Sequence, residues 1–113
     1  MEEKITVLNV EGLPLSFKNP EVVGFLKLYK EKCYENGIPN PIDYNIDIDI
    51  GMDLDSGHKV YDFKFPAVGK SDPYVLYDDG TKTWEFMNVH HKGLFENLTY
   101  TDVVRILIYR ILN

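Results

Sequence analysis

The sequence has a single cysteine, Cys33, which excludes an intramolecular disulfide framework and fits a reducing compartment. It also lacks a long hydrophobic run: the most apolar stretch, residues 103–112, contains two arginines and is about half the roughly twenty residues that a membrane-spanning helix needs. The first residues lack the basic and apolar regions of a secretory signal. No glycine-rich phosphate loop and no serine nucleophile elbow is present. These absences predict a soluble, cytoplasmic protein.

Basic residues are also in the minority, with 12 Lys and Arg against 18 Asp and Glu, which gives a formal net charge of −6. This balance argues against a generic binder of nucleic acid or of anionic membrane surfaces. The 113 residues are 44% hydrophobic and 13% aromatic, which is the composition of an ordinary globular protein. We therefore expect one globular domain over residues 1–113.

The negative charge is confined to the middle of the chain. Residues 43–79 contain nine acids, all of them Asp, and three lysines, so this segment carries the whole net charge of −6. Aspartate favours turns whereas glutamate suits helices, so part of the enrichment reflects strands and loops in this segment. A solvated face explains the charge run as well as a binding surface does.

Two segments have the pattern of helices. Asn19 can cap a helix that begins at Pro20 and is stopped by Gly37, with Val22, Phe25, Leu26, Tyr29 and Cys33 forming one apolar stripe. A second helix near the C-terminus would be capped by Thr99 or Thr101. Its many β-branched residues leave a strand as the alternative.

Alternation of apolar and polar residues predicts strands over residues 4–10, 43–50, 58–65, 74–77 and 83–89. The first is apolar on both faces and is therefore predicted to be an inner strand. Gly51 is expected to mark a break or bulge, and residues 78–80 to join the last two strands in a hairpin, where Gly80 is able to take a positive φ. The order β-α-β-β-β-β-α predicts an α+β fold, in which two helices pack on one face of an antiparallel sheet of about four to five strands.

The strand over residues 43–50 alternates with unusual regularity. Its isoleucines would point to one face and its aspartates to the other. A hairpin with residues 58–65 would place Lys59 or Lys64 across from the aspartates, where pairs of opposite charge are favourable. Along such a strand, aspartates two residues apart are separated by about 6.6–7 Å, close to the distance between successive phosphates of nucleic acid.

Metal and catalytic motifs are weak. Residues 53–57 superficially resemble a calcium loop, but Gly57 falls at the fifth position rather than the sixth. His90 and His91 would point to opposite faces of a strand, while His58 could approach the aspartates to form a mixed His/Asp site. Cys33 lies on an apolar stripe, so we expect a buried thiol whose pKa is not lowered. We predict no metal and no cofactor.

These observations favour a small acidic, non-enzymatic binding protein, such as an inhibitor or immunity-type protein. It would present an Asp-rich strand edge to a basic partner that handles nucleic acid, for example a nuclease. The predicted contact residues are Asp43, Asp47, Asp49, Asp53 and Asp55, together with Tyr44 and Tyr61. Two alternatives stay open: a homo-oligomeric scaffold that associates through the C-terminal helix, and a small metal-dependent hydrolase that uses the Asp/His set.

Overall fold

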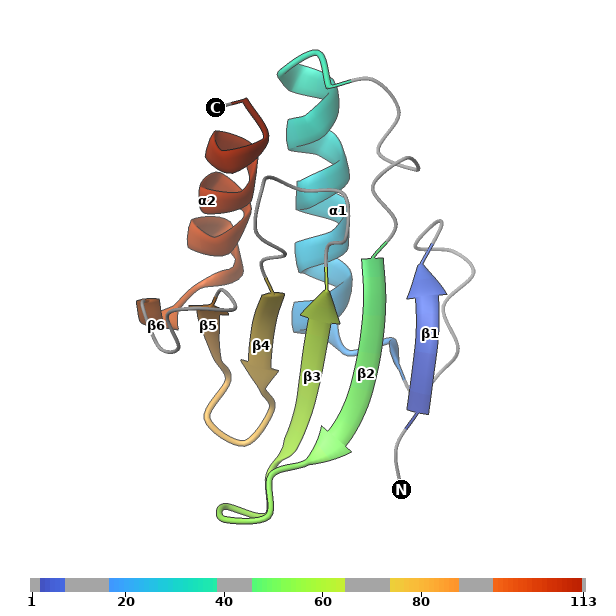
Figure 1. The fold of residues 1–113 in the computed structure, drawn as a ribbon, viewed down its shortest axis with the longest axis vertical. Helices are drawn as coiled ribbons and strands as arrows, with labels where there is room; N and C mark the ends of the chain where they lie inside the picture. Colours follow the sequence, from blue (N-terminus) through green and yellow to red (C-terminus); the bar gives the residue numbers. More distant parts are fainter. Residues whose placement is uncertain (1–2, 8–16, 39–45, 65–73, 88–94, 113) are drawn as a thin grey trace.

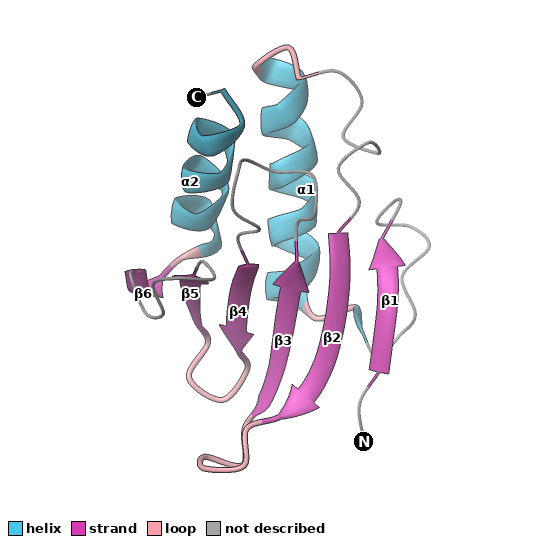
Figure 2. Ribbon diagram, viewed as in Figure 1, coloured by secondary structure: helices cyan, strands magenta, loops and turns pink. Residues whose placement is uncertain are grey.

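In this computed structural model, the described part of the chain comprises residues 3–7, 17–38, 46–64, 74–87 and 95–112. These residues contain two helices and six strands (Figures 1 and 2). Both helices lie on one face of the sheet. In chain order the elements are β1 (Glu3–Val7), α1 (Pro20–Glu35), β2 (Ile46–Met52), β3 (Lys59–Lys64), β4 (Tyr74–Asp78), β5 (Thr83–Met87), β6 (Phe95–Leu98) and α2 (Tyr100–Leu112).

The strands lie in the order β1-β2-β3-β4-β5-β6, and every neighbouring pair is antiparallel. The predicted α+β class is confirmed. The described sheet has six strands, one more than the largest number predicted. The additional strand, β6, has only four residues, and its pairing with β5 is irregular between Trp84 and Phe86, so no alternation in the sequence indicates it. The first strand lies at the edge of this sheet rather than inside it, since in the described part of the chain it pairs with β2 alone.

Helix α1 begins and ends where the sequence predicts. The side chain of Asn19 accepts a hydrogen bond from the backbone N–H of Glu21 at 2.9 Å, which satisfies one of the free donors of the first turn. At the other end Gly37 has a φ of +67°, and the N–H of Ile38 donates to the carbonyl of Cys33. The predicted apolar stripe is buried.

The C-terminal segment is a helix and not a strand. Thr99, rather than Thr101, caps it: the N–H of Asp102 donates to the Thr99 hydroxyl, and the Thr99 N–H donates to the Asp102 carboxylate at 3.1 Å. Near the start of α2, Tyr100 packs against Gly24 of α1, where an added Cβ would come within 3.1 Å of the Tyr100 ring. A glycine therefore lets the two helices approach closely here.

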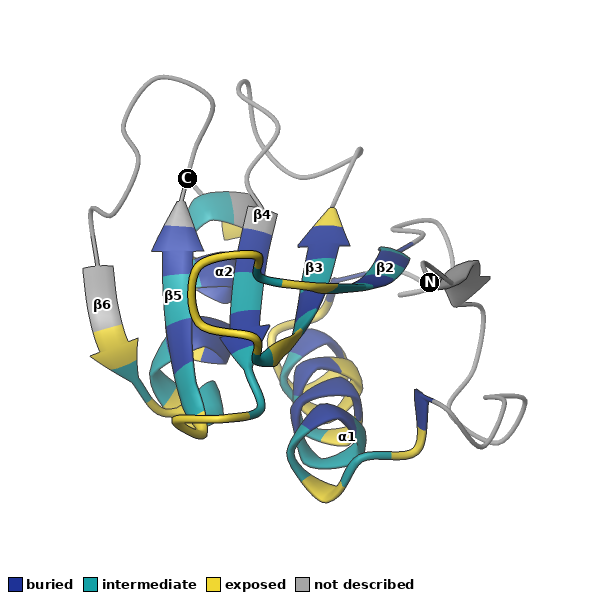
Figure 3. Ribbon diagram, turned by 90° about the horizontal axis from the view of Figure 1, so that it is seen from below, coloured by how far each residue is buried: buried dark blue, intermediate teal, exposed yellow. Residues whose placement is uncertain are grey.

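The core lies between the helices and the inward face of the sheet (Figure 3). Phe25 of α1 is its centre, with ring centroids 5.2 Å from Phe63 and 4.9 Å from Trp84. Trp84 in turn lies 4.7 Å from the ring of Tyr77. These aromatic contacts fix α1 to the middle strands of the sheet.

The expectation for Gly51 is wrong, whereas the hairpin between β4 and β5 is confirmed with a different residue in the left-handed conformation. Gly51 lies within β2 in regular register with Val60, so it marks neither a break nor a bulge. Gly80 is not among the residues with positive φ; in the β4–β5 loop Lys82 takes that conformation, with φ of 58°. This loop is longer than a two-residue turn, because Asp78 pairs with Thr83, and its last position is the left-handed one.

No helix in the described ranges has the length and apolar character needed to cross a membrane.

Candidate functional site: an acidic sheet face

The face of the sheet opposite the helices, here called the outer face, carries the aspartates of β2. Ile46, Ile48 and Ile50 are buried toward the helices, and Asp47 and Asp49 alternate with them and are only partly buried. This confirms the predicted one-sided arrangement for these two aspartates. The outer face is therefore left uncovered by α1 and α2, as Figure 3 shows.

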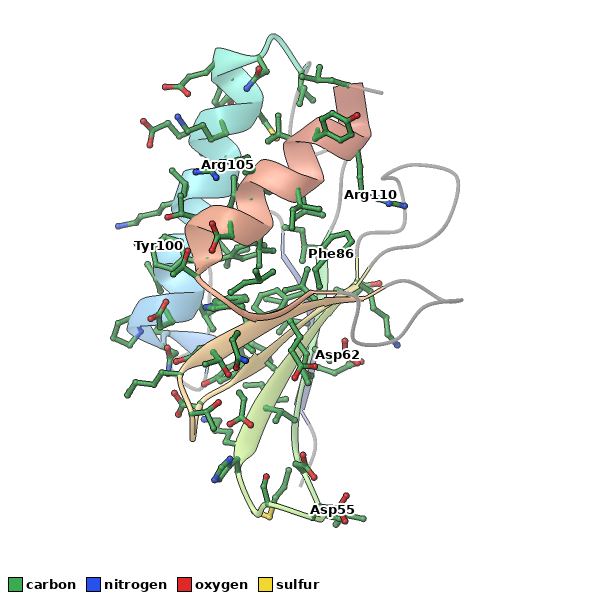
Figure 4. The ribbon with its side chains drawn as sticks, turned by 90° about the vertical axis from the view of Figure 1, so that its left-hand side faces the viewer. Asp55, Asp62, Phe86, Tyr100, Arg105 and Arg110 are labelled. Carbon is green, nitrogen blue, oxygen red and sulfur yellow. The ribbon has the colours of Figure 1, made fainter. Side chains whose placement is uncertain are left out.

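A third carboxylate, that of Asp62 on β3, stands directly across from Asp49 in the register of the two strands. Figure 4 shows Asp62 on the side of the sheet away from the helices. Like charges directly opposite each other in a sheet are destabilising. Lys64 moderates the repulsion only in part: its ammonium lies 3.7 Å from the Asp49 carboxylate, and it is the register partner of Asp47. Lys59, the other predicted partner, is instead opposite Met52.

The Asp62 carboxylate lies in an unfavourable environment. Its Oδ1 atom is buried and has no hydrogen-bond partner among the residues that the structure describes. Burial raises the pKa of this carboxyl above its usual value, Lys64 lowers it in part, and the negative charge of Asp49 raises it further. The protein therefore holds a carboxylate here at a cost in stability.

A shallow hollow of about 240 Å³ opens on the outer face beside this pair. Asp49 and Asp62 supply carboxylates to its lining, and Val60 and Leu76 supply apolar side chains. Gly51 contributes no side chain to the wall. The hollow therefore combines acidic and apolar walls.

The β2–β3 loop extends the acidic character to the end of the sheet, where Figure 4 shows Asp55 at the tip. Asp53 holds the turn, because its carboxylate accepts a hydrogen bond from the N–H of Asp55 at 2.9 Å. Gly57 adopts a φ of +76° to complete it. The carboxylate of Asp55 is left exposed.

His58 does not join the aspartates of β2. Its Nδ1 lies 3.1 Å from a carboxylate oxygen of Asp78 on β4, and its ring packs on Gly80, where there is no room for a Cβ. Burial alone would raise the pKa of Asp78, but the hydrogen bonds from His58 and from the N–H groups of Thr81 and Gly80 outweigh it and lower that pKa. These contacts tie the two hairpin loops together.

The predicted contact residues divide into three groups. Asp47, Asp49, Asp53 and Asp55 lie along one continuous strand and loop. Tyr61 faces the helices and is buried in the core, with 1% of its surface exposed. It cannot contact a partner, so it is not part of the candidate contact surface. Asp43 and Tyr44 lie outside the described residues.

Asp62 is not among the contact residues predicted from the sequence. The alternation over residues 58–65 placed it on the polar side of its strand, but only the exact register of the hairpin brings it opposite Asp49.

The Cys33 thiol is fully buried, and burial raises its pKa to about 11, as expected for a structural cysteine. In the described ranges, no three His, Cys, Asp or Glu side chains are grouped so that they could hold a metal ion. His90 and His91, which the sequence places on opposite faces of a strand, lie outside those ranges.

Comparison of the chain with protein families, curated proteins and solved structures found no match.

Replacing Asp62 with asparagine is expected to stabilise the protein at neutral pH by about 1 kcal/mol, since it removes the charge repulsion and supplies an amide donor toward Asp49. The folded-state pKa of Asp62 is raised, so the folded protein binds the proton more tightly than the unfolded chain does. The resulting penalty is absent below the ordinary pKa of about 4 and grows as pH rises through the raised pKa. Urea unfolding from pH 3 to pH 7 should show the stability gain of Asp62→Asn over wild type shrinking toward zero at the acidic end. A gain that is independent of pH would contradict this account.

Proposed function

We propose that this chain is a non-enzymatic binding protein that engages a basic protein through its acidic surface. That surface comprises Asp47, Asp49 and Asp62 on the outer face and Asp53 and Asp55 in the β2–β3 loop. The partner's Lys and Arg residues provide the complementary charge. Asp47, Asp49 and Asp62 stand on paired strands, so little backbone entropy is lost at these positions when a partner binds.

The observation that carries this proposal is the facing pair Asp49 and Asp62. The two like charges oppose each other in the register of β2 and β3, burial and the charge of Asp49 raise the pKa of Asp62, and Lys64 offsets these effects only in part. A cation from a partner placed between the two carboxylates would relieve the repulsion and donate to Asp62 Oδ1, which accepts no hydrogen bond from any described residue. Polar arrangements that reduce stability are often retained at binding sites.

The partner class that we favour is a protein that handles nucleic acid, such as a nuclease that this chain inhibits. A groove that binds a phosphate backbone is lined with Lys and Arg. Asp47 and Asp49 lie two residues apart on β2, which corresponds to about 6.6–7 Å and approximates the phosphate spacing. Occupation of such a groove by these carboxylates would exclude the nucleic acid.

The test is affinity capture of the partner from the native cell, followed by binding measurements with the purified partner. The double variant Asp47→Asn/Asp49→Asn is expected to bind about tenfold more weakly than wild type, at roughly 0.7 kcal/mol for each of these two partly buried charges. Its affinity should also depend less steeply on salt, because fewer charges are screened.

The matched control is Glu31→Gln/Glu35→Gln, which removes the same number of charges from the exposed side of α1. This control should bind as wild type does. Equal losses in the two double variants would show that only overall charge matters, and unchanged affinity in both would reject the acidic surface as the binding site. For a captured nuclease, inhibition of its activity should follow the same order.

A further inference from the structure

Two of the most exposed hydrophobic side chains of the described residues lie beside the acidic surface. Met52, at the end of β2, is 65% exposed, and Leu54, in the β2–β3 loop, is 95% exposed. Single exposed hydrophobic residues are ordinary in proteins, but here two lie within three residues of one another on the same hairpin. Asp53 and Asp55 alternate with them along the chain.

The hollow on the outer face continues this combination. Met52 lines the hollow together with Val60 and Leu76, and the Asp49 and Asp62 carboxylates complete its lining. Acidic and apolar residues thus lie together in the hollow, and Leu54 follows Met52 two residues later in the β2–β3 loop. A partner that offers cations alone would leave the apolar part exposed to water.

We infer that the partner's contacting segment is both basic and apolar, with an arginine that enters the hollow and hydrophobic side chains that cover Met52 and Leu54. This inference rests on the proposed function and specifies the partner's chemistry. The guanidinium would lie between Asp49 and Asp62, which it can contact through several parallel N–H groups, while its alkyl stem packs on Val60 and Leu76. Burial of the hydrophobic contacts supplies affinity that salt does not screen.

Two synthetic peptides of equal length and equal arginine content test the inference. One carries leucine and the other serine between its arginines. Wild-type protein is expected to bind the leucine peptide at least about tenfold more tightly, which corresponds to about 1.4 kcal/mol. Met52→Ser/Leu54→Ser should remove that preference and have a much smaller effect on the serine peptide, which would meet Met52 only where it lines the hollow. Both residues are exposed, so the variant should keep the stability of the wild type.

The control Tyr34→Ser/Leu112→Ser removes exposed hydrophobic residues from the two helices and should keep the leucine preference. Equal binding of both peptides, with affinities that fall in Asp47→Asn/Asp49→Asn, would overturn the apolar contact and leave the proposed function standing. Binding of neither peptide would overturn the inference, while the capture experiment would still decide the proposed function independently. A leucine preference that survives Met52→Ser/Leu54→Ser would also overturn it.

Discussion

Replacing Phe25 with alanine is expected to lower the free energy of unfolding by about 3–5 kcal/mol. The side chain is fully buried, and it joins α1 to the sheet through ring contacts with Phe63 and Trp84. Its loss leaves a cavity in the centre of the core that neighbouring aromatic rings cannot fill without leaving their rotamers. Because a domain's whole stability is about 5–15 kcal/mol, this single change should bring the protein close to unfolding at moderate temperature.

Urea unfolding followed by circular dichroism measures the effect, and the fluorescence of Trp84, the single tryptophan, provides a second probe. Phe25→Leu keeps much of the volume and should cost less than about 1.5 kcal/mol. Lys27→Ala, on the exposed side of the same helix, should change stability by less than about 0.5 kcal/mol. A loss below about 1 kcal/mol for Phe25→Ala would contradict the central place of this residue in the core.

Replacing Asn19 with alanine should cost about 2–3 kcal/mol, which is large for a residue at the surface. Its side chain performs two tasks. The Oδ1 atom caps α1, and the Nδ2 group donates to the Asp79 carboxylate at 2.9 Å across 60 residues of sequence. The hydroxyl of Tyr77 donates to the same carboxylate at 3.3 Å. Asn19 therefore fixes the start of α1 to the β4–β5 loop.

The two tasks can be separated by comparing substitutions. Asn19→Asp keeps an N-cap but places a carboxylate against Asp79, so it should lose the link and keep the cap. A double-mutant cycle of Asn19→Ala with Asp79→Ala should give a coupling energy of about 1 kcal/mol or more. Additive losses would show that the two side chains do not interact.

The helices and most strands could be predicted because their signals are local. Asn19, Pro20 and Gly37 define the ends of α1 by their own side-chain and backbone chemistry, and the alternation around Ile48 defines β2. The failures lie where an element is too short to show a pattern or where distant parts of the chain decide the structure. The four residues of β6 are too few for a periodic pattern, and the edge position of β1 follows from pairing order, which its own sequence does not encode.

The candidate site shows the same division. The outward direction of Asp47 and Asp49 follows from their own strand, whereas the burial of Tyr61 depends on which face the helices cover. The repulsion between Asp49 and Asp62 depends on the register of the hairpin, and a shift by one residue would remove it. Likewise, His58 contacts Asp78 of β4 and not an aspartate of β2. The sequence of the β2–β3 hairpin alone does not reveal this contact, because it depends on the pairing of β4 with β3.

The most direct test of the acidic surface is the affinity of the captured partner for Asp47→Asn/Asp49→Asn and for Glu31→Gln/Glu35→Gln, measured over a range of salt concentrations. The account predicts about tenfold weaker binding and a shallower salt dependence for the first variant, and wild-type behaviour for the second. Equal behaviour of the two variants would contradict it.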